Sequence, residues 1–326
     1  MPVRSFAVVV CTRNRPDDVA RLLENLTGEA EPGMQVWIVD ASDEEARHRN
    51  AAAVEAFTAA PIHYLLFPGT PSLARQRNVA IDALPASIEI VHFLDDDVTV
   101  HPGYFSALHA VFEDDPSVGG VGGRILQAGT DPERRGLRWR RLFLLDHPAP
   151  GRVLCSGATT PAQALPLTTR TPVEWLSGCS CAFRRSLLAW HRFDPALEGY
   201  SLDEDLDFSY RIGRTARLVV EPAAVLTHHV TPGGRGDASR LAHDAIVHRY
   251  WFLEKNLRSP WRRPAFWWSV LGRLLAAGAS RSPQAHHVLR ARLRAVGTIL
   301  RRAHPLLRPD ARASVDSSRR HTERIS

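Results

Sequence analysis

Hydrophobic positions in the first 115 residues alternate between short continuous runs and runs spaced as on one face of a helix. Continuous runs rich in β-branched and aromatic residues predict buried strands at residues 6–10, 36–39, 62–67 and 90–94. Apolar side chains three and four residues apart predict helices beginning at Pro16, near Ser72 and near Pro102. Strands and helices that alternate in this way form a mostly parallel sheet with helices on both faces. The pattern therefore predicts an α/β fold.

Acidic residues stand where two of the predicted strands end. Asp40 follows the second strand, and Asp95, Asp96 and Asp97 follow the fourth. Ligands of parallel α/β sheets gather at the carboxyl ends of the strands. Because side chains two apart in a strand share a face, Asp95 and Asp97 are expected to point the same way, with Asp96 turned aside. Two carboxylates there suit Mg²⁺ or Mn²⁺, and the alternative is a solvated acidic turn.

A second acidic cluster follows a stretch with little regular pattern. Residues 118–172 are rich in Gly, Pro and polar side chains and predict a variable loop region with a short strand or two. Small and apolar residues at 174–183 then predict a further strand. Four acids then open a predicted helix: Asp203, Glu204, Asp205 and Asp207. One or two acids would complement the helix dipole, so the others indicate a further role such as that of a general base.

The charge distribution divides the chain near residue 258. The net charge is +6, but residues 257–326 hold fifteen Arg and no Lys against three acids, a balance of +12, so the preceding part carries −6. We expect a catalytic domain at residues 1–258 and an Arg-rich helical extension at residues 259–326. The composition from Pro309 onward predicts disorder.

The extension contains one aromatic and apolar segment, residues 265–277, with Trp267 and Trp268 near its start and Arg273 within it. Trp beside Arg on an amphipathic helix is typical of a bilayer interface, which would make an anionic membrane surface a partner. The same pattern suits a helix packed on the core, with Arg stems along apolar surface. No segment reaches the roughly 18 apolar residues needed to span a bilayer.

The cysteines and the N-terminus indicate a cytoplasmic protein. Four cysteines lack the paired spacing of a zinc site and are interpreted as reduced thiols. No signal peptide is visible, because the first residues run straight into a strand. If the extension binds lipid, the protein is expected at the inner face of the cell membrane. The Arg-rich tail has no RNA-reading motif, so nucleic acid is not an expected partner.

The order of the motifs resembles that of family 2 glycosyltransferases. The matching stretches are VVCTRNRP at residues 9–16, Asp40, ARQRN at 74–78, FLDDD at 93–97, residues 178–184 and EDLD at 204–207. The helix at residues 248–256 resembles that of rhamnosyltransferase-like members. The likeness covers about residues 5–256. It implies a GT-A fold, which is Rossmann-like, and inverting, metal-dependent transfer of a sugar from a nucleotide-sugar donor to an acceptor hydroxyl.

The resemblance also implies roles for individual residues. Asp205 would remove the proton of the acceptor hydroxyl, and Glu204 would assist it. Asp95, Asp97 and His228 would hold the divalent cation, Mg²⁺ or Mn²⁺. The residues expected to bind the nucleotide sugar are Thr12, Arg13, Asp40, Arg77, Asn78, Asp95, Asp96 and Arg235.

Structural alternatives exist for several of these residues. Asp40 could cap a turn, Arg77 could be a surface residue of its helix, and a lone His is more often structural than a ligand. Two other classes of protein also compete. A nucleotidyltransferase acting on sugar phosphates would share the nucleotide and metal residues without needing Glu204 and Asp205. A non-catalytic nucleotide-sugar-binding protein is disfavoured because every expected catalytic position is filled. The acceptor is expected to be a glycan, a lipid-linked sugar or a natural product.

Overall fold

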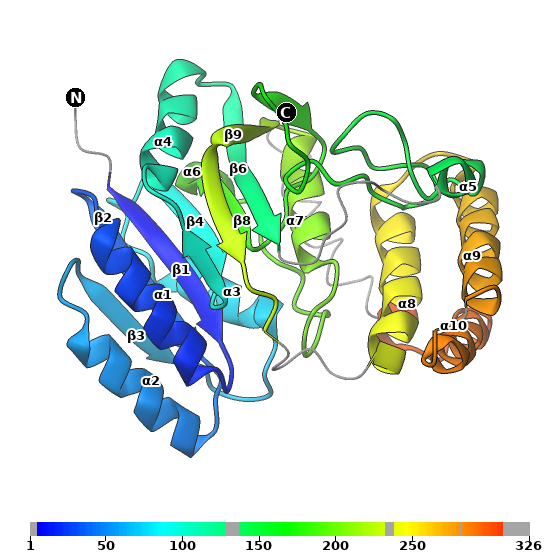
Figure 1. The fold of residues 1–326 in the computed structure, drawn as a ribbon, viewed down its shortest axis with the longest axis horizontal. Coiled ribbons are helices and arrows are strands. Elements are labelled where there is room, and N and C mark those ends of the chain that lie inside the picture. Colours follow the sequence, from blue (N-terminus) through cyan, green and yellow to red (C-terminus); the bar gives the residue numbers. More distant parts are fainter. Residues whose placement is uncertain (1–4, 128–136, 232–237, 281, 309–326) are drawn as a thin grey trace. The chain divides into compact units, whose positions relative to one another are not determined.

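A mixed β-sheet with helices on both faces forms the first of two units of the chain (Figure 1). The computed structural model describes residues 5–127, 137–231, 238–280 and 282–308. The first unit comprises Met1–Arg135, His147–Val153 and Thr159–Arg235. The second comprises Gly136–Asp146, Leu154–Ala158 and Gly236–Ser326.

The strands of the sheet lie in the order β3-β2-β1-β4-β8-β6-β9-β5, and β7 also pairs with β9. Their bounds are β1 Phe6–Thr12, β2 Met34–Asp40, β3 Ile62–Leu66, β4 Ile90–Asp95, β5 Val98–Val100, β6 Val118–Gln127, β7 Thr171–Val173, β8 Ser180–Arg184 and β9 Arg217–His228. The first four strands in this order are parallel, as expected. β8 is antiparallel to both of its neighbours, and β5 and β7 are antiparallel to β9. β6 and β9 are parallel to each other, so the sheet is mixed, with the expected parallel arrangement in its N-terminal half and again in the β6–β9 pair.

Helices cover both faces of the sheet. The helices of the first unit are α1 Pro16–Gly28, α2 Glu44–Ala56, α3 Leu73–Ala83, α4 Tyr104–Asp114, α6 Arg185–Leu188 and α7 Glu204–Gly213. The apolar stripes of α1 and α4 pack on one face, against alternate residues of β1 such as Val8 and Val10. On the other face, Phe208 of α7 and Arg77 of α3 both contact Phe93 of β4. Both faces of β4 are thereby buried, which is why its sequence is a continuous apolar run.

The strand ends bring the polar residues of the site to one edge of the sheet. In the parallel register, Thr12 of β1 lies opposite Asp40 of β2, and Cys11 lies opposite Asp95 of β4. This agrees with the expectation that the carboxyl ends of these strands carry the site.

Helix α2 was not predicted, because its sequence EEARHRNAAAVEA has only a weak apolar stripe. Its start is fixed by Asp43, whose side chain accepts a hydrogen bond from the Ala46 amide. Asn50 on its inner side is fully buried. A polar residue turned inward weakens the periodicity by which a helix is recognised from sequence.

The second unit is helical. It contains α5 Leu137–Leu142, α8 Ala238–Asn256, α9 Arg262–Gly278, α10 Ala285–Leu300 and the short 3₁₀ helix η1 Pro305–Leu307. Helix α8 packs on both α9 and α10 and belongs to this unit with them. Among the described residues no helix is both long and apolar enough to cross a bilayer. The expected disorder from Pro309 onward lies outside the described residues.

Candidate active site

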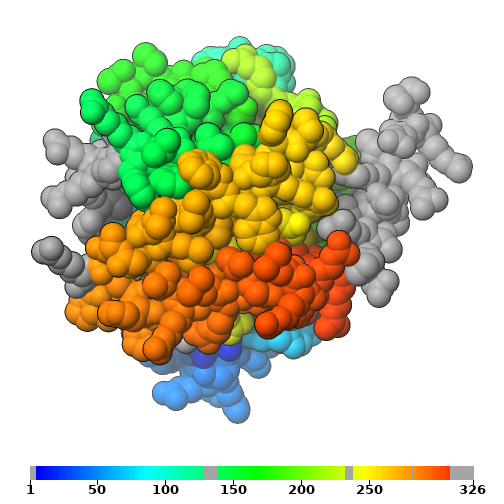
Figure 2. Space-filling view, turned by 90° about the vertical axis from the view of Figure 1, so that its right-hand side faces the viewer, coloured from blue at the N-terminus to red at the C-terminus, as the bar shows by residue number. Residues whose placement is uncertain are grey.

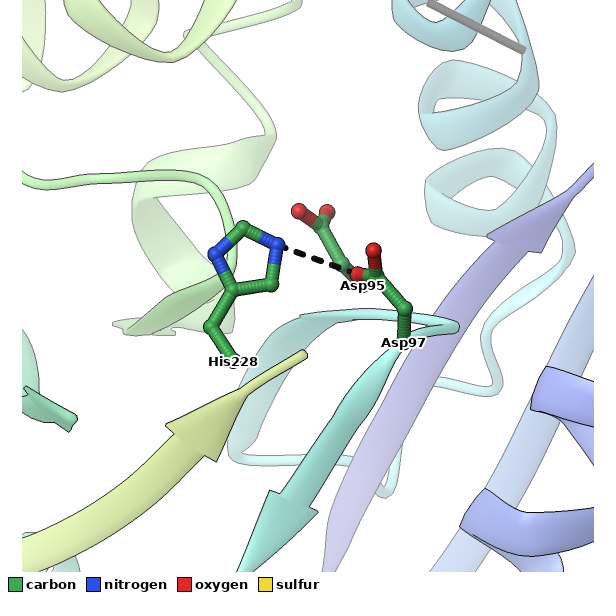
Figure 3. Close-up of side chains that lie close together, drawn as sticks. All are labelled: Asp95, Asp97 and His228. Atoms are coloured by element: carbon green, nitrogen blue, oxygen red, sulfur yellow. Dashed lines mark ion pairs between the residues drawn. The ribbon is translucent and has the colours of Figure 1, made fainter. Parts of the chain in front are cut away.

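Asp95, Asp97 and His228 form a cluster that could hold a metal ion (Figure 3). One ligand atom from each lies within 4.8 Å of the others. Strand β4 ends at Asp95, a turn follows, and the pairing of β5 with β9 sets His228 opposite Val98, the residue after Asp97. Two carboxylates and one imidazole suit Mn²⁺ or Mg²⁺. The expected grouping of Asp95 and Asp97 is thus present, but its expected cause is wrong, because a turn and not a shared strand face brings them together.

Asp97 is held on several sides. His228 Nε2 lies 3.1 Å from Asp97 Oδ1, and the Thr231 amide donates to Oδ2 at 2.9 Å. Burial alone would raise the pKa of Asp97, but the hydrogen bond from His228, together with Thr231 and Arg15, lowers it to about 2. Asp97 is therefore an anion at neutral pH, as a metal ligand must be.

Asp96 is turned away from this cluster, as expected, but into the protein and not into solvent. Its Oδ2 accepts a hydrogen bond from the Thr12 hydroxyl at 2.8 Å, and its Oδ1 accepts one from Arg15 at 2.8 Å. Burial raises its pKa to about 7, although Arg15 and Thr12 oppose the shift. These contacts make Asp96 an anchor for Thr12, the last residue of β1, and for Arg15 in the loop that follows.

Arg15 is a residue that sequence reasoning missed. Its guanidinium also lies 3.4 Å from Asp97 and donates to the Thr231 carbonyl oxygen at 3.1 Å. The available signal was its place in the run Arg13-Asn14-Arg15 directly before the helix-starting Pro16. It ties the loop after β1 to the segment after β9.

Arg77 lies inside the protein and is 2% exposed. It donates to Glu204 Oε1 at 2.5 Å, to Asp95 Oδ1 at 3.3 Å and to the Gly178 carbonyl oxygen at 3.0 Å. The central carbon of the guanidinium lies over the rings of Phe93 and Phe193, 5.6 and 5.3 Å from their centroids. The surface alternative for Arg77 is therefore excluded, and its guanidinium connects the metal cluster to the start of α7.

Glu204 is the buried counter-ion of this arginine. Burial raises the pKa of Glu204, and the Arg77 charge opposes the shift. The absence of a side chain at Gly178 leaves room for Arg77 and Glu204 to meet, because a Cβ there would lie 2.7 Å from Arg77 Nη1 and 3.1 Å from Glu204 Oε1. The geometry gives Glu204 a supporting place beside Asp205.

Asp205 stands in the first turn of α7 and is partly exposed. Its Oδ2 accepts a hydrogen bond from the Gly178 amide at 2.8 Å, and its Oδ1 accepts one from the Leu206 amide at 2.7 Å. Burial raises the pKa of Asp205, while the Gly178 amide opposes the shift. A carboxylate that is fixed by backbone amides and has a raised pKa is suited to accept a proton.

Two cavities meet at these side chains. The larger, of about 270 Å³, is lined by Arg77, Asp95, Glu204, Asp205 and His228 on its polar side. Its other wall contains Leu73, Ile125, Pro161, Trp175, Tyr200 and Leu202. The smaller, of about 90 Å³, is lined by Thr12, Arg13, Arg15, Gln76, Asp95 and Asp96 among others. Because Asp95, Leu73 and Tyr200 line both, the cavities are neighbours on one site.

Trp175 and Tyr200 are further cavity residues that the motifs did not reveal. The Trp175 indole N–H donates to the Thr160 carbonyl oxygen at 3.1 Å, which fixes the ring. Tyr200 lines both cavities and is 42% exposed. Their sequence signal was weak, since an aromatic residue near a strand or loop is usually part of a core.

Two of the expected donor-binding residues are not brought to the cavities. Asp40 is completely buried, and its carboxylate accepts hydrogen bonds from the Ser42 amide, Asn50 and Tyr64. Asn78 uses its amide to donate to and accept from the backbone of Phe193. Both side chains brace loops beside the site in this structure. Arg235 lies outside the described residues.

The family match supplies the identity that this geometry suggests. Residues 7–189 match the sequence profile of glycosyl transferase family 2. The chain belongs to this family. A search of curated proteins finds no match.

Solved structures place the fold of this family 2 member among the GT-A glycosyltransferases. The Pyrobaculum calidifontis mannosyltransferase PcManGT, in complex with GDP-Man and Mn²⁺, is 18% identical with a TM-score of 0.54, over 97% of this chain and 85% of that chain. GalNAc-T7 with UDP, GalNAc and Mn²⁺ is 14% identical with a TM-score of 0.61, over 90% of this chain and 55% of that chain. S. aureus TarS with UDP-GlcNAc is 14% identical with a TM-score of 0.55, over 90% of this chain and 81% of that chain. The expected α/β GT-A fold is thereby confirmed.

Proposed function

We propose that this family 2 member is a metal-dependent, inverting glycosyltransferase that moves a sugar from a nucleotide-sugar donor to an acceptor hydroxyl. The observation that carries the proposal is that Asp95 and His228 of the metal cluster line the same cavity as Asp205. Such a transfer requires side chains that bind a cation and a side chain that accepts a proton, and both kinds line this one cavity. The GDP-Man, UDP and UDP-GlcNAc complexes of the similar structures support a nucleotide-sugar donor.

The residues of this chain divide the reaction between them. The smaller cavity, with Arg13, Arg15 and Gln76 on its wall, would take the nucleotide part of the donor. Asp95, Asp97 and His228 would hold the cation, which when bound offsets the negative charge on the departing diphosphate. The donor sugar would then lie in the larger cavity, next to Asp205.

Asp205 would act at the moment of transfer. The acceptor oxygen forms a bond to the anomeric carbon while the bond from that carbon to the diphosphate oxygen breaks. The hydroxyl proton passes to the Asp205 carboxylate in the same step. One displacement on one face of the sugar ring inverts the configuration. The buried Arg77–Glu204 pair keeps Gly178, and through its amide Asp205, in place.

The nucleotidyltransferase alternative is less well supported. It would use the metal cluster but leave Asp205, with its raised pKa and its place on the cavity wall, without a role. The family match across residues 7–189 also favours transfer of a sugar.

Binding of a nucleoside diphosphate is expected to require Mn²⁺ or Mg²⁺. Asp97→Asn should weaken the binding of UDP or GDP by more than about tenfold, because it removes one of the charges that hold the cation. His228→Gln should act in the same direction. The measurement is the rise in melting temperature with each nucleotide, with and without MnCl₂, which mass action links to affinity.

Asp82→Asn is the matched control for this test, because Asp82 is an exposed carboxylate paired only at the surface with Arg192 at 3.1 Å. It should bind nucleotide as the wild type does. If a nucleotide raises the melting temperature of the wild type as much in excess EDTA as in MnCl₂, the carboxylates do not hold a cation for the nucleotide.

The pH dependence of transfer should reflect the raised pKa of Asp205. Only the carboxylate form accepts the proton, so activity is present above that pKa and is lost as the pH falls through it. The acid limb of kcat should therefore lie above the value of about 3.9 that is ordinary for Asp. The profile is measured at saturating donor, with circular dichroism at each pH to separate loss of rate from acid unfolding. An acid limb at the ordinary value contradicts the assignment.

A further inference from the structure

Exposed apolar side chains line one side of α9 in the second unit. Trp261, Trp268, Leu271 and Leu275 are seven, three and four residues apart, which places them on one face of the helix. Each is between 41% and 71% exposed. The opposite face of α9 is buried through Phe266 and Val270. Packing on the rest of the unit thus accounts for one face of α9 and leaves the other at the surface.

The adjacent tryptophans illustrate this division. Trp267 is half-buried and packs on Tyr250 of α8, with ring centroids 6.2 Å apart. Trp268 is 43% exposed. Packing within the unit therefore accounts for the first ring and leaves the second at the surface.

Helix α5 enlarges the exposed face of α9. The Trp268 indole N–H donates to the Leu142 carbonyl oxygen at 2.7 Å. The Phe143 ring stacks on Trp268 at 4.8 Å and contacts Trp139 at 4.5 Å. Gly272 allows this approach, because a Cβ there would lie 2.4 Å from the Phe143 ring.

We name the combined surface the α5–α9 patch. Its members are Trp139, Leu142, Trp261, Trp268, Leu271 and Leu275. Trp139 and Leu142 are 41% and 60% exposed. Figure 2 faces this unit, with α9 in orange. Two segments that are distant in sequence thus build one exposed aromatic and aliphatic surface.

Positive charge accompanies the patch. Arg138, Arg140 and Arg141 of α5 are all exposed. Residues 257–308 contain eleven Arg and no acidic residue, whereas residues 309–326 contain four Arg and three acids. Three of these eleven, Arg262, Arg263 and Arg273, lie in α9, so the basic charge of the extension lies mainly before residue 309 and part of it is on a helix that carries the patch.

We propose that the α5–α9 patch docks on an anionic lipid bilayer. Trp and Leu side chains would enter the boundary between headgroups and acyl chains, where aromatic rings with a polar edge are favoured. The surrounding Arg side chains would reach the lipid phosphates while their stems cover apolar surface. Neither α5 nor α9 contains an acidic residue, so the charge beside the patch is of one sign and complements the phosphates of an anionic bilayer. This proposal is independent of the glycosyl transfer proposed above.

The test is sedimentation of the full chain with vesicles. Vesicles of equal parts phosphatidylglycerol and phosphatidylcholine should carry the protein down at low salt, and pure phosphatidylcholine vesicles should not. The double variant Trp261→Ser/Leu271→Ser should reduce partitioning by about tenfold or more, because it removes apolar area that enters the bilayer. Replacing all three α5 arginines by Gln should cost about fivefold for each.

The matched control is Trp190→Ser/Leu66→Ser, which removes an exposed Trp and an exposed Leu from the first unit. It should sediment as the wild type does, and so should a chain that ends at Arg308. Three results would overturn the proposal. These are no binding to anionic vesicles at low salt, equal losses in patch and control variants, or loss of binding when residues 309–326 are removed. A wild-type dimer that the patch variant converts to monomer would instead assign the surface to a second copy of the chain.

Discussion

Asp205→Asn is expected to reduce sugar transfer by about 10²–10⁴-fold while leaving donor binding unchanged. The substitution keeps the shape of the side chain and an oxygen that can accept the hydrogen bond from the Gly178 amide, now 2.8 Å from Asp205. It removes only the basicity. The loss should therefore appear in kcat, because the proton is transferred in the transition state and not when the donor binds.

Neighbouring acids provide the controls for this experiment. Asp203→Asn should reduce the rate of transfer least, since Asp203 is the residue before α7 and its side chain makes no capping hydrogen bond. Glu204→Gln should cost less transfer than Asp205→Asn, because Glu204 acts through Arg77. If Glu204→Gln abolishes transfer and Asp205→Asn does not, the base is assigned one residue too late. If neither substitution matters, glycosyl transfer loses its base and the nucleotidyltransferase hypothesis moves ahead.

Arg77→Met is expected to lower the free energy of unfolding by about 3–5 kcal/mol. Arg77 and Glu204 are both nearly fully buried and lie 2.5 Å apart, so removal of either leaves the other as an uncompensated buried charge. Asp95 loses a partner at 3.3 Å as well. A pair of this kind contributes little net stability compared with an apolar pair, yet removal of one member alone is costly.

Urea unfolding of the single and double variants separates these effects. Glu204→Gln alone should also be destabilising, and Arg77→Met/Glu204→Gln should be less destabilised than the sum of the two. Arg75→Met is the matched control on the same helix, because Arg75 is exposed and makes only surface contacts, to the Pro195 carbonyl oxygen at 3.0 Å and to Glu198 at 3.5 Å. Arg75→Met should lower the free energy of unfolding by no more than about 1 kcal/mol. Equal midpoints for Arg77→Met and Arg75→Met would mean that the buried pair is not a structural element.

The fold class could be predicted because its signals are local. Continuous apolar runs identified β1 to β4, and helical spacing identified α1, α3 and α4. Helix α2 and the antiparallel arrangement of β8 could not be predicted in this way. The first has a weak apolar stripe, and strand direction depends on partners that are distant in the chain.

The sequence by itself determined which residue types stand at the strand ends and at the start of α7, and hence the candidate chemistry of Asp95, Asp97 and Asp205. Only the tertiary structure decided which of the candidate side chains meet. The register of β5 with β9 places His228 beside Asp97, whereas Asp40 is drawn inward by Asn50 and Tyr64. The physical reason is that a buried polar group must find a partner, and that partner is supplied by long-range packing. A motif fixes the chemical group and its place in the chain, but the direction in which the group points is settled by residues that the motif does not contain.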